Sequence, residues 1–238
     1  MCSESRVNPV NRWWPGHAIR LWSLGRHPWI ALAALLAALV VCGRWWYVVM
    51  PTRLLGQFEP RWIQVIEVGP VAAGIIVMVA LAPRNPRVDA LGRRRRRAVS
   101  AAAALVGAAA ATSMPIATVY GLSTLPSDWV PAHEQYVPPG QHFIDVVDFH
   151  SVIVIMFTIV FVVGLAAGLV ALLGVIWGAG GAIASYPTLI FVQSTDFGQA
   201  MTAIPVSLWG ALSTLVALAG LTMWYRTGAG EPVLARLV

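Results

Sequence analysis

Imidazole and carboxylate side chains, which can bind metals or transfer protons, gather in one segment of this 238-residue chain. The segment Pro126–His150 holds three of the five histidines and four of the ten acidic residues, and it contains no arginine. Imidazole nitrogen and carboxylate oxygen are ligands for Cu or Zn, so one hypothesis for this segment is a metal site. Its candidate ligands are His133, His142, Asp145, Asp148 and His150.

The spacing of these residues favours no particular metal motif. His142, Asp145 and Asp148 recur every three residues, so a helix there would hold them near one face. A zinc hydrolase motif would need a second histidine four residues after His133, where the chain has Val137. The alternative is structural: the acids cap the start of the next apolar helix and complement its dipole, while the histidines lie in the headgroup layer.

A lone carboxylate inside an apolar run is a second chemical candidate. Glu67 lies about 8 Å inside an expected span at 1.5 Å per residue. Hydrocarbon does not hydrate a carboxylate, so Glu67 must pair, protonate or face a polar cavity. Arg44 and Arg61 enter the membrane from the same side and are candidate partners. Two interpretations stay open, a structural ion pair and a role in transport or proton movement.

Membrane helices are the elements expected to position these groups. The chain is 58% hydrophobic and only 11% charged, with a mean hydropathy of +0.72, which excludes an ordinary soluble domain. Several apolar runs reach the roughly 20 residues needed to cross a hydrocarbon core of about 30 Å. We therefore expect an all-α integral membrane protein. Its six expected spans are at about 29–49, 62–81, 99–122, 148–173, 182–192 and 200–225.

Shorter features complete the expected layout. Residues 1–28 form a cytoplasmic or interfacial segment with a short interfacial helix, and residues 226–238 form a cytoplasmic tail. The glycine-rich stretch 174–182 predicts a tight turn or a broken helix, and the fifth span either crosses fully or is re-entrant. Gly164 and Gly168, four residues apart, permit close contact with another helix.

Arginines set the expected orientation in the cell membrane. All sixteen basic residues are arginine, and seven lie between Arg84 and Arg97. The positive-inside rule places this loop and both termini in the cytoplasm, and the acid-containing loop 123–147 outside. Because the arginines flank apolar spans, we expect contact with membrane lipid and other protein subunits, but not with nucleic acid. Candidates for cytoplasmic partner or lipid contact are Arg93, Arg94, Arg95, Arg96 and Arg97.

The general layout resembles small actinobacterial membrane subunits of ATP-binding-cassette exporters. The resemblance rests on four features: an N-terminal amphipathic segment, six spans, an arginine-rich loop after the second span, and a glycine-rich fourth span before a proline-containing fifth. The residues of the last feature are Gly164, Gly168, Gly174, Gly178 and Pro187. The resemblance implies a permease-like subunit of a transport complex, which dimerises and couples to a separate ATPase. The chain has no P-loop, so any ATP hydrolysis must come from another chain. Under this interpretation we expect no catalytic activity of the chain itself.

Two alternative functions stay open. The copper-bearing subunit of the membrane monooxygenases for methane and ammonia places an Asp and two His in an external segment before a span. This chain has the same order in Asp128, His133 and His142, although the numbers of residues between them differ. This resemblance implies a subunit of a membrane-bound, metal-dependent oxidoreductase with metal at the external segment 128–150. The second alternative is a non-catalytic accessory subunit of a larger membrane complex.

Overall fold

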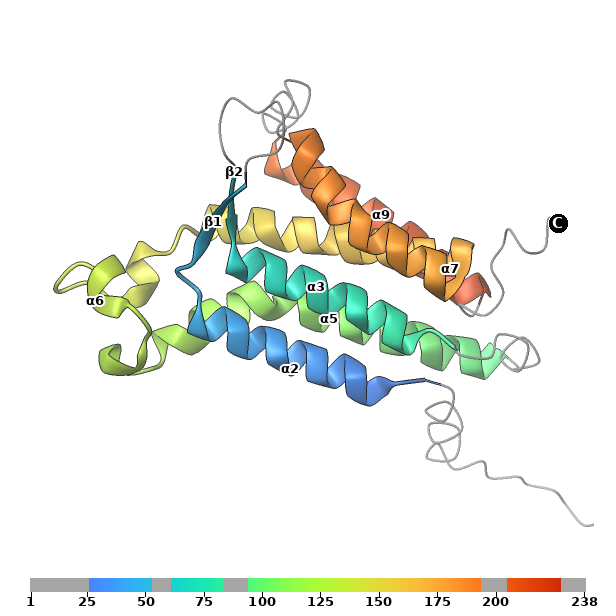
Figure 1. Cartoon of the computed structure of the whole chain (residues 1–238), viewed down its shortest axis with the longest axis horizontal. Coiled ribbons are helices and arrows are strands. Elements are labelled where there is room, and N and C mark those ends of the chain that lie inside the picture. The colour runs from blue at the N-terminus through green and yellow to red at the C-terminus, as the bar shows by residue number, and fades with distance from the viewer. Residues whose placement is uncertain (1–25, 53–60, 84–93, 194–204, 228–238) are drawn as a thin grey trace, which may run out of the picture.

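An antiparallel helical bundle makes up the part of the chain that the computed structural model describes, residues 26–52, 61–83, 94–193 and 205–227 (Figure 1). Its long helices are α2 (Pro28–Arg44), α3 (Val65–Leu81), α5 (Arg94–Ser123), α7 (Phe149–Gln193) and α9 (Val206–Thr227). The expected interfacial helix and the C-terminal tail lie outside the described residues, apart from their first or last few positions.

Length and composition make these helices candidates for crossing a membrane. Within the described residues, three helices are long and apolar enough to do so, namely Arg97–Ser123, Phe149–Gln193 and Val206–Thr227. The shorter apolar helices α2 and α3 have 17 residues each, or about 25 Å at 1.5 Å per residue, which is close to the thickness of a hydrocarbon core. The expectation of an all-α protein with membrane-length apolar helices is confirmed, whereas the count of six crossings stays a prediction.

A short β-hairpin replaces the expected loop and shortens the first two expected spans. β1 (Val49–Thr52) pairs antiparallel with β2 (Arg61–Gln64). Consequently α2 ends at Arg44 instead of residue 49, and α3 begins at Val65 instead of residue 62. Valine and isoleucine favour strands as well as apolar helices, so hydropathy alone could not locate this change of structure.

Gly174 divides α7 into two helical segments. Its φ of 81° and ψ of 178° are backbone values that glycine adopts far more readily than other residues, and the chain reverses direction there. The second segment, residues 175–193, is called the arm. A Cβ added at Gly178 in the arm would lie 2.5 Å from the Cα of Val170, so the two segments are in close contact near the turn.

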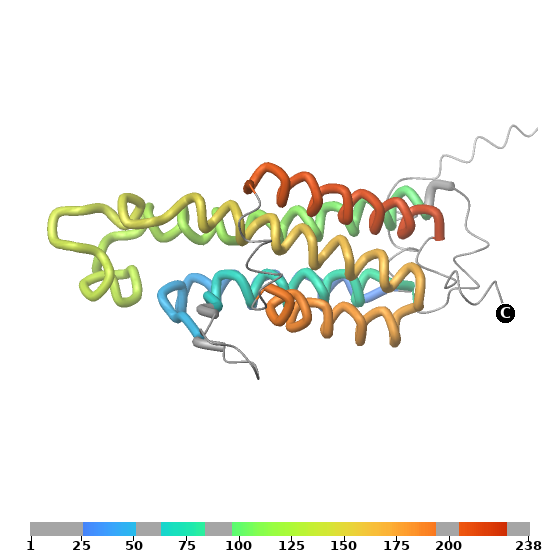
Figure 2. The backbone as a smooth tube through the Cα atoms, turned by 90° about the horizontal axis from the view of Figure 1, so that it is seen from above, coloured from blue at the N-terminus to red at the C-terminus, as the bar shows by residue number. Residues whose placement is uncertain are grey.

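The break at Gly174 confirms one expectation about this region and corrects another. A tight turn or a broken helix is expected within residues 174–182, and the helix breaks at Gly174. The arm, however, is longer than the expected fifth span, 182–192. In Figure 2 the arm and α9 lie on opposite sides of the first segment of α7. The arm is therefore a peripheral helix of the bundle.

Small residues allow α7 and α9 to pack closely. A Cβ added at Gly164 would lie 2.5 Å from the Cα of Ala217, and one added at Gly168 would lie 3.5 Å from the Cα of Gly220. The close helix contact expected from Gly164 and Gly168 is therefore confirmed, and α9 is the partner helix. Nearby, the rings of Phe161 and Trp209 stack with centroids 5.4 Å apart.

The two ends of the bundle differ in charge. One end holds the starts of α2 and α5, the Gly174 turn and the end of α9 (Figure 1), and we call it the arginine end because Arg26, Arg97 and Arg226 lie there. The opposite end holds the β-hairpin and residues 124–148, which we call the acidic segment. The acidic segment contains three short helices, η1 (Ser127–Trp129), α6 (His133–Tyr136) and η2 (Phe143–Val146).

Candidate functional site

Trp46 joins the end of α2 to the acidic segment. Its indole Nε1–H donates a hydrogen bond of 2.9 Å to the carbonyl oxygen of Pro131, 85 residues further along the chain. Its ring makes edge-to-face contacts with Phe143, Tyr136 and Tyr47, with centroid separations of 4.7, 5.8 and 5.9 Å. Each such pair contributes about 0.5–1.5 kcal/mol beyond burial, so the rings hold the acidic segment against the bundle.

A cavity of about 290 Å³ lies next to these rings, and we call it the aromatic cavity. Its lining combines the four aromatic rings with apolar side chains of α5 and α7. Polar groups from different elements complete the lining: Gln64, Thr118, Asp148 and Ser151. Its volume is at the lower end of the range of about 300–1,000 Å³ for ligand pockets, so it suits a small molecule.

Thr118 of α5 contributes a buried hydroxyl to this lining. The residue is only 4% exposed, and its Oγ1 has no hydrogen-bond partner among the described residues. Leaving a buried polar group unpaired costs about 1–3 kcal/mol, which is why most such groups in folded proteins are satisfied. Thr118 lines the aromatic cavity, and its hydroxyl is a buried group whose hydrogen-bonding capacity no described residue uses.

Asp148 and Asp145 act as local helix caps. The Asp148 carboxylate accepts hydrogen bonds from the backbone N–H groups of His150 and Ser151, at 3.0 and 3.3 Å, and from the Ser151 hydroxyl. The hydroxyl bond and the backbone bonds hold the pKa of Asp148 below its usual range. The Asp145 carboxylate accepts a 3.0 Å bond from the backbone N–H of His142. The capping alternative is therefore confirmed for Asp148, which caps the apolar helix α7, whereas Asp145 caps the short helix η2.

The structure does not bring the expected metal ligands together. Among the described residues, no group of three His, Cys, Asp or Glu side chains is placed to hold a metal ion. His133 lies in α6, Asp145 in η2, and His150 in the first turn of α7. The helix expected to align His142 with Asp148 is absent, because η2 ends at Val146 and α7 begins only at Phe149.

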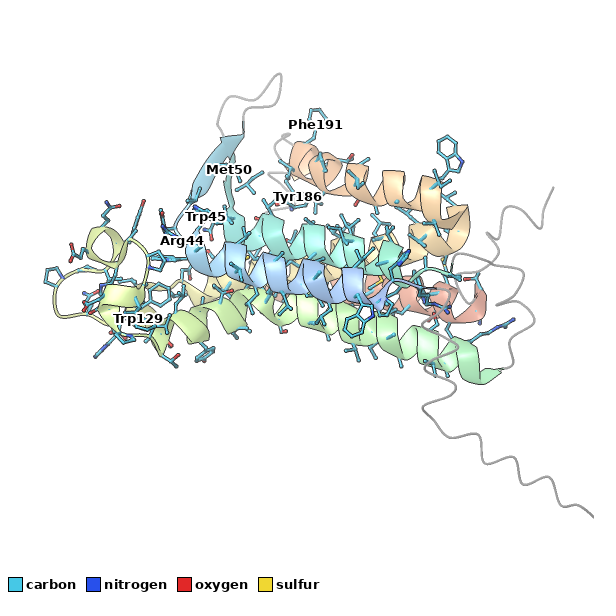
Figure 3. The ribbon with its side chains drawn as sticks, turned by 60° about the horizontal axis from the view of Figure 1, so that its bottom comes forward. Arg44, Trp45, Met50, Trp129, Tyr186 and Phe191 are labelled. Carbon is cyan, nitrogen blue, oxygen red and sulfur yellow. The ribbon has the colours of Figure 1, made fainter. Side chains whose placement is uncertain are left out.

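Glu67 lies near the start of a helix, and its depth within a membrane stays a prediction. It is in the first turn of α3, since α3 begins at Val65, and it is 5% exposed. A carboxylate in the first turn is stabilised by the positive end of the helix dipole. Arg44 is exposed in the last turn of α2 at the same end of the bundle (Figure 3), and the side chain of Arg61 lies outside the described part. Their pairing with Glu67 stays a prediction.

A buried polar cluster lies at the arginine end. The Arg26 Nε–H donates to the carbonyl oxygen of Leu81 at 2.8 Å, and its Nη2–H donates to the Ser100 hydroxyl at 3.4 Å. The Trp224 Nε1–H donates to the same hydroxyl at 3.1 Å. The two Arg26 bonds join the start of the described chain, just before α2, to α3 and α5. The Trp224 bond joins α9 to α5.

The arginine cluster expected to contact lipid or a partner is only partly described. Arg97 is half-buried, and its Nη1–H donates to the carbonyl oxygen of Arg226 at 3.3 Å. Arg93 and the side chains of Arg94, Arg95 and Arg96 lie outside the described part. Lipid or partner contact by the cluster stays a prediction.

An apolar cleft of about 820 Å³ lies between α3 and the arm. Its walls are almost entirely aliphatic, from Val68 to Val79 on α3 and from Val175 to Pro187 on the arm. Tyr186 lines it from the side of the arm that faces α3, whereas Phe191 points away from the bundle (Figure 3). The cleft can therefore accept an apolar group.

The aromatic cavity and the apolar cleft are thus two distinct candidate sites. No family model, no curated protein and no solved structure matches this chain. Its function therefore has to be argued from the chemistry of these two sites and of the two ends of the bundle.

Of the residues that line the aromatic cavity, the sequence pointed to Asp148 but not to the aromatic rings or Thr118. The run Trp45–Tyr47 carried a signal, since clustered aromatic residues mark a membrane interface. Nothing in the sequence indicated that Trp46 would bond to Pro131, or that the Thr118 hydroxyl would be left without a described partner, because both depend on how distant helices pack.

Proposed function

We propose that this chain is a permease-like subunit of a multi-subunit transport complex in the cell membrane, driven by a separate ATPase chain. The observation that carries the proposal is the apolar cleft of about 820 Å³ between α3 and the arm. A cleft between helices, open on one side of a bundle, can become half of a pathway when a second permease subunit covers it. Its aliphatic walls favour an apolar substrate or an apolar part of one.

The proposed orientation has six crossings with the arginine end in the cytoplasm. The two segments of α7 together with α2, α3, α5 and α9 run alternately up and down the bundle (Figure 1). Arginines at one end and carboxylates at the other agree with the positive-inside rule. Both termini would then lie on the cytoplasmic side.

The arginine end also offers a surface for a soluble ATPase. Ile176 and Trp177, directly after the Gly174 turn, are 83% and 77% exposed. The start of α5, with its arginines, lies at the same end (Figure 1). Tryptophan and arginine are the side chains most enriched in the energetic centres of protein interfaces, so this end suits contact with a partner.

The alternatives differ in how the structure supports them. A metal-dependent oxidoreductase would need a ligand set, and the described residues contain none. A non-catalytic accessory subunit needs only a stable bundle with exposed apolar surface, and it is the second candidate. The presence of an associated ATPase separates this candidate from a permease.

Purification from native membranes in mild detergent tests the proposal. An ATPase chain should co-purify in a fixed ratio with the tagged protein, and its ATP turnover should change when the permease is present. Preparations that repeatedly contain other membrane subunits but no ATPase would overturn the permease proposal in favour of the accessory subunit.

Two exposed tryptophans at opposite ends give a matched pair of variants. Trp177→Ala should reduce recovery of the ATPase at least tenfold, as expected for an interface residue that contributes about 2 kcal/mol. Trp129→Ala, which removes a tryptophan that is 73% exposed in the acidic segment, should leave recovery unchanged. Equal losses in both variants would contradict docking at the arginine end.

A further inference from the structure

The lining of the aromatic cavity favours a particular ligand chemistry. It includes the indole, phenol and phenyl rings of Trp46, Tyr47, Tyr136 and Phe143. Ring faces attract cations within about 6 Å of the ring centroid, most strongly those of tryptophan. An ammonium group would therefore be attracted by the rings, and a compact apolar body attached to it would pack against the apolar side chains of the lining.

Charge near the cavity points to the same chemistry. The Asp148 carboxylate is part of the lining, and Asp128, Glu134 and Asp145 are exposed in the same acidic segment. Against these four carboxylates, Arg44 is the one exposed guanidinium among the side chains described at this end. This excess of negative charge attracts cations to the cavity and disfavours anions.

The Thr118 hydroxyl supplies the hydrogen-bonding position. Its oxygen is buried in the wall and has no partner among the described residues, so it can accept a hydrogen bond from an N–H donor. A bond to a charged donor contributes more than a bond between neutral groups.

We infer that the aromatic cavity binds a small organic cation, a protonated amine that carries a compact apolar group. The rings and Asp148 attract the charge, and Thr118 accepts a hydrogen bond from the ammonium group. The inference is independent of the proposed transport function, because it concerns the end of the bundle opposite the ATPase-docking surface.

Calorimetric titration of the purified full-length protein with 2-phenylethylamine, using empty micelles as the blank, tests the inference. Saturable binding at millimolar or lower concentration is expected. The neutral analogue 2-phenylethanol and the anion phenylacetate, which share the phenyl ring, should bind at least tenfold more weakly. No saturable heat above the blank, or equal binding of the neutral analogue, would overturn the inference.

Thr118→Val tests the assigned hydrogen bond with little change in shape. It should weaken binding of the amine about tenfold or more, because a hydrogen bond to a charged group is lost. Replacing a hydroxyl that has no described partner should not lower the unfolding temperature. The matched control is Ser213→Ala in α9, which removes another buried hydroxyl with no partner among the described residues, away from the cavity. Unchanged affinity in Thr118→Val would overturn the assignment.

A second variant keeps the inference testable if Thr118→Val does not fold. Asp148→Asn retains an amide that can cap α7 but removes the charge. The affinity for 2-phenylethylamine should fall about two- to fivefold, as expected for the loss of a partly solvated charge, and the affinity for 2-phenylethanol should not change. Equal affinity of the wild type and Asp148→Asn for the amine would contradict a cation site.

Discussion

The carboxylate of Asp148 organises the first turn of α7 through its bonds to the backbone of His150 and Ser151 and to the Ser151 hydroxyl. These bonds satisfy N–H groups that have no partner within the helix. They also favour the ionised form of the carboxyl group, which is why its pKa lies below the usual range. A proton therefore binds more tightly in the unfolded chain than in the folded one.

Asp148→Ala should lower the unfolding temperature of the detergent-solubilised protein at neutral pH. The stabilisation from Asp148 is fully present above the ordinary aspartate pKa of about 3.9, and it is lost as pH falls through the lower pKa of the folded state. The difference between wild type and variant should thus be constant above about pH 5 and should shrink below about pH 4. Thermal unfolding at several pH values measures it.

Asp128→Ala is the control for this prediction. Asp128 is also exposed in the acidic segment, but its carboxylate accepts a hydrogen bond from the adjacent Ser127 hydroxyl at 3.2 Å and does not cap a long helix. Its substitution should change the unfolding temperature less. A difference for Asp148→Ala that persists undiminished at low pH would show that the charge is not the cause.

For single residues, the sequence predicted the role of a side chain better than its position in the fold. Acids just before an apolar run predict helix caps, and Asp148 is one. The place of Glu67 within its helix could not be predicted, because it depends on where the helix begins, and the hairpin moves that start to Val65. The polar wall of the aromatic cavity could not be predicted, since Thr118 lies in α5 and Asp148 lies just before α7, and these segments meet only in the folded state.

At the scale of elements, the packing of α7 against α9 depends on the absence of side chains. Gly220→Ala would place a methyl group against the backbone carbonyl of Gly164, and backbone cannot move aside as a flexible side chain can. The two helices would have to separate. We expect destabilisation of about 1–3 kcal/mol, measured by unfolding in mixed detergent micelles.

Gly180→Ala is the matched control for this substitution. A Cβ at Gly180 would meet no atom of the described residues within 4 Å. Alanine favours helix over glycine by about 1 kcal/mol, so this variant should be neutral or slightly more stable. Equal destabilisation by both substitutions would contradict the assigned helix contact.

Local signals in the sequence explain which elements could be predicted. Long apolar runs predicted α5, the first segment of α7 and α9, and the spacing of Gly164 and Gly168 predicted a close contact. The hairpin could not be predicted from hydropathy, because its strands continue the apolar character of the adjacent helices. Four glycines lie between residues 174 and 182, and sequence alone could not distinguish which one would break the helix.

At the scale of the whole molecule, the charge difference between the two ends predicts a fixed orientation. In a chain with Cys2→Ser, a membrane-impermeant thiol reagent should label Ser127→Cys in intact cells, because Ser127 is exposed in the acidic segment. Ala98→Cys, exposed near the start of α5, should be labelled only after the cells are opened. Cys42 is buried and should not interfere.

The outcomes of this labelling experiment are distinct. Labelling at Ser127→Cys alone in intact cells supports the proposed orientation. Labelling at Ala98→Cys alone would show that the protein has the opposite orientation. Labelling at both positions in intact cells would contradict a six-crossing bundle with opposite ends on opposite sides of the membrane.

The polar cluster at the arginine end has a consequence for biogenesis. Ser100 bonds to Arg26, 74 residues earlier, and to Trp224, 124 residues later. At about 5–20 residues per second, the ribosome takes roughly 6–25 s to make the chain between Ser100 and Trp224. During that time the first helices are inserted without their last partner. The cluster therefore completes only when the final helix arrives, and a truncated chain that lacks α9 would present an incomplete inner surface to membrane quality control.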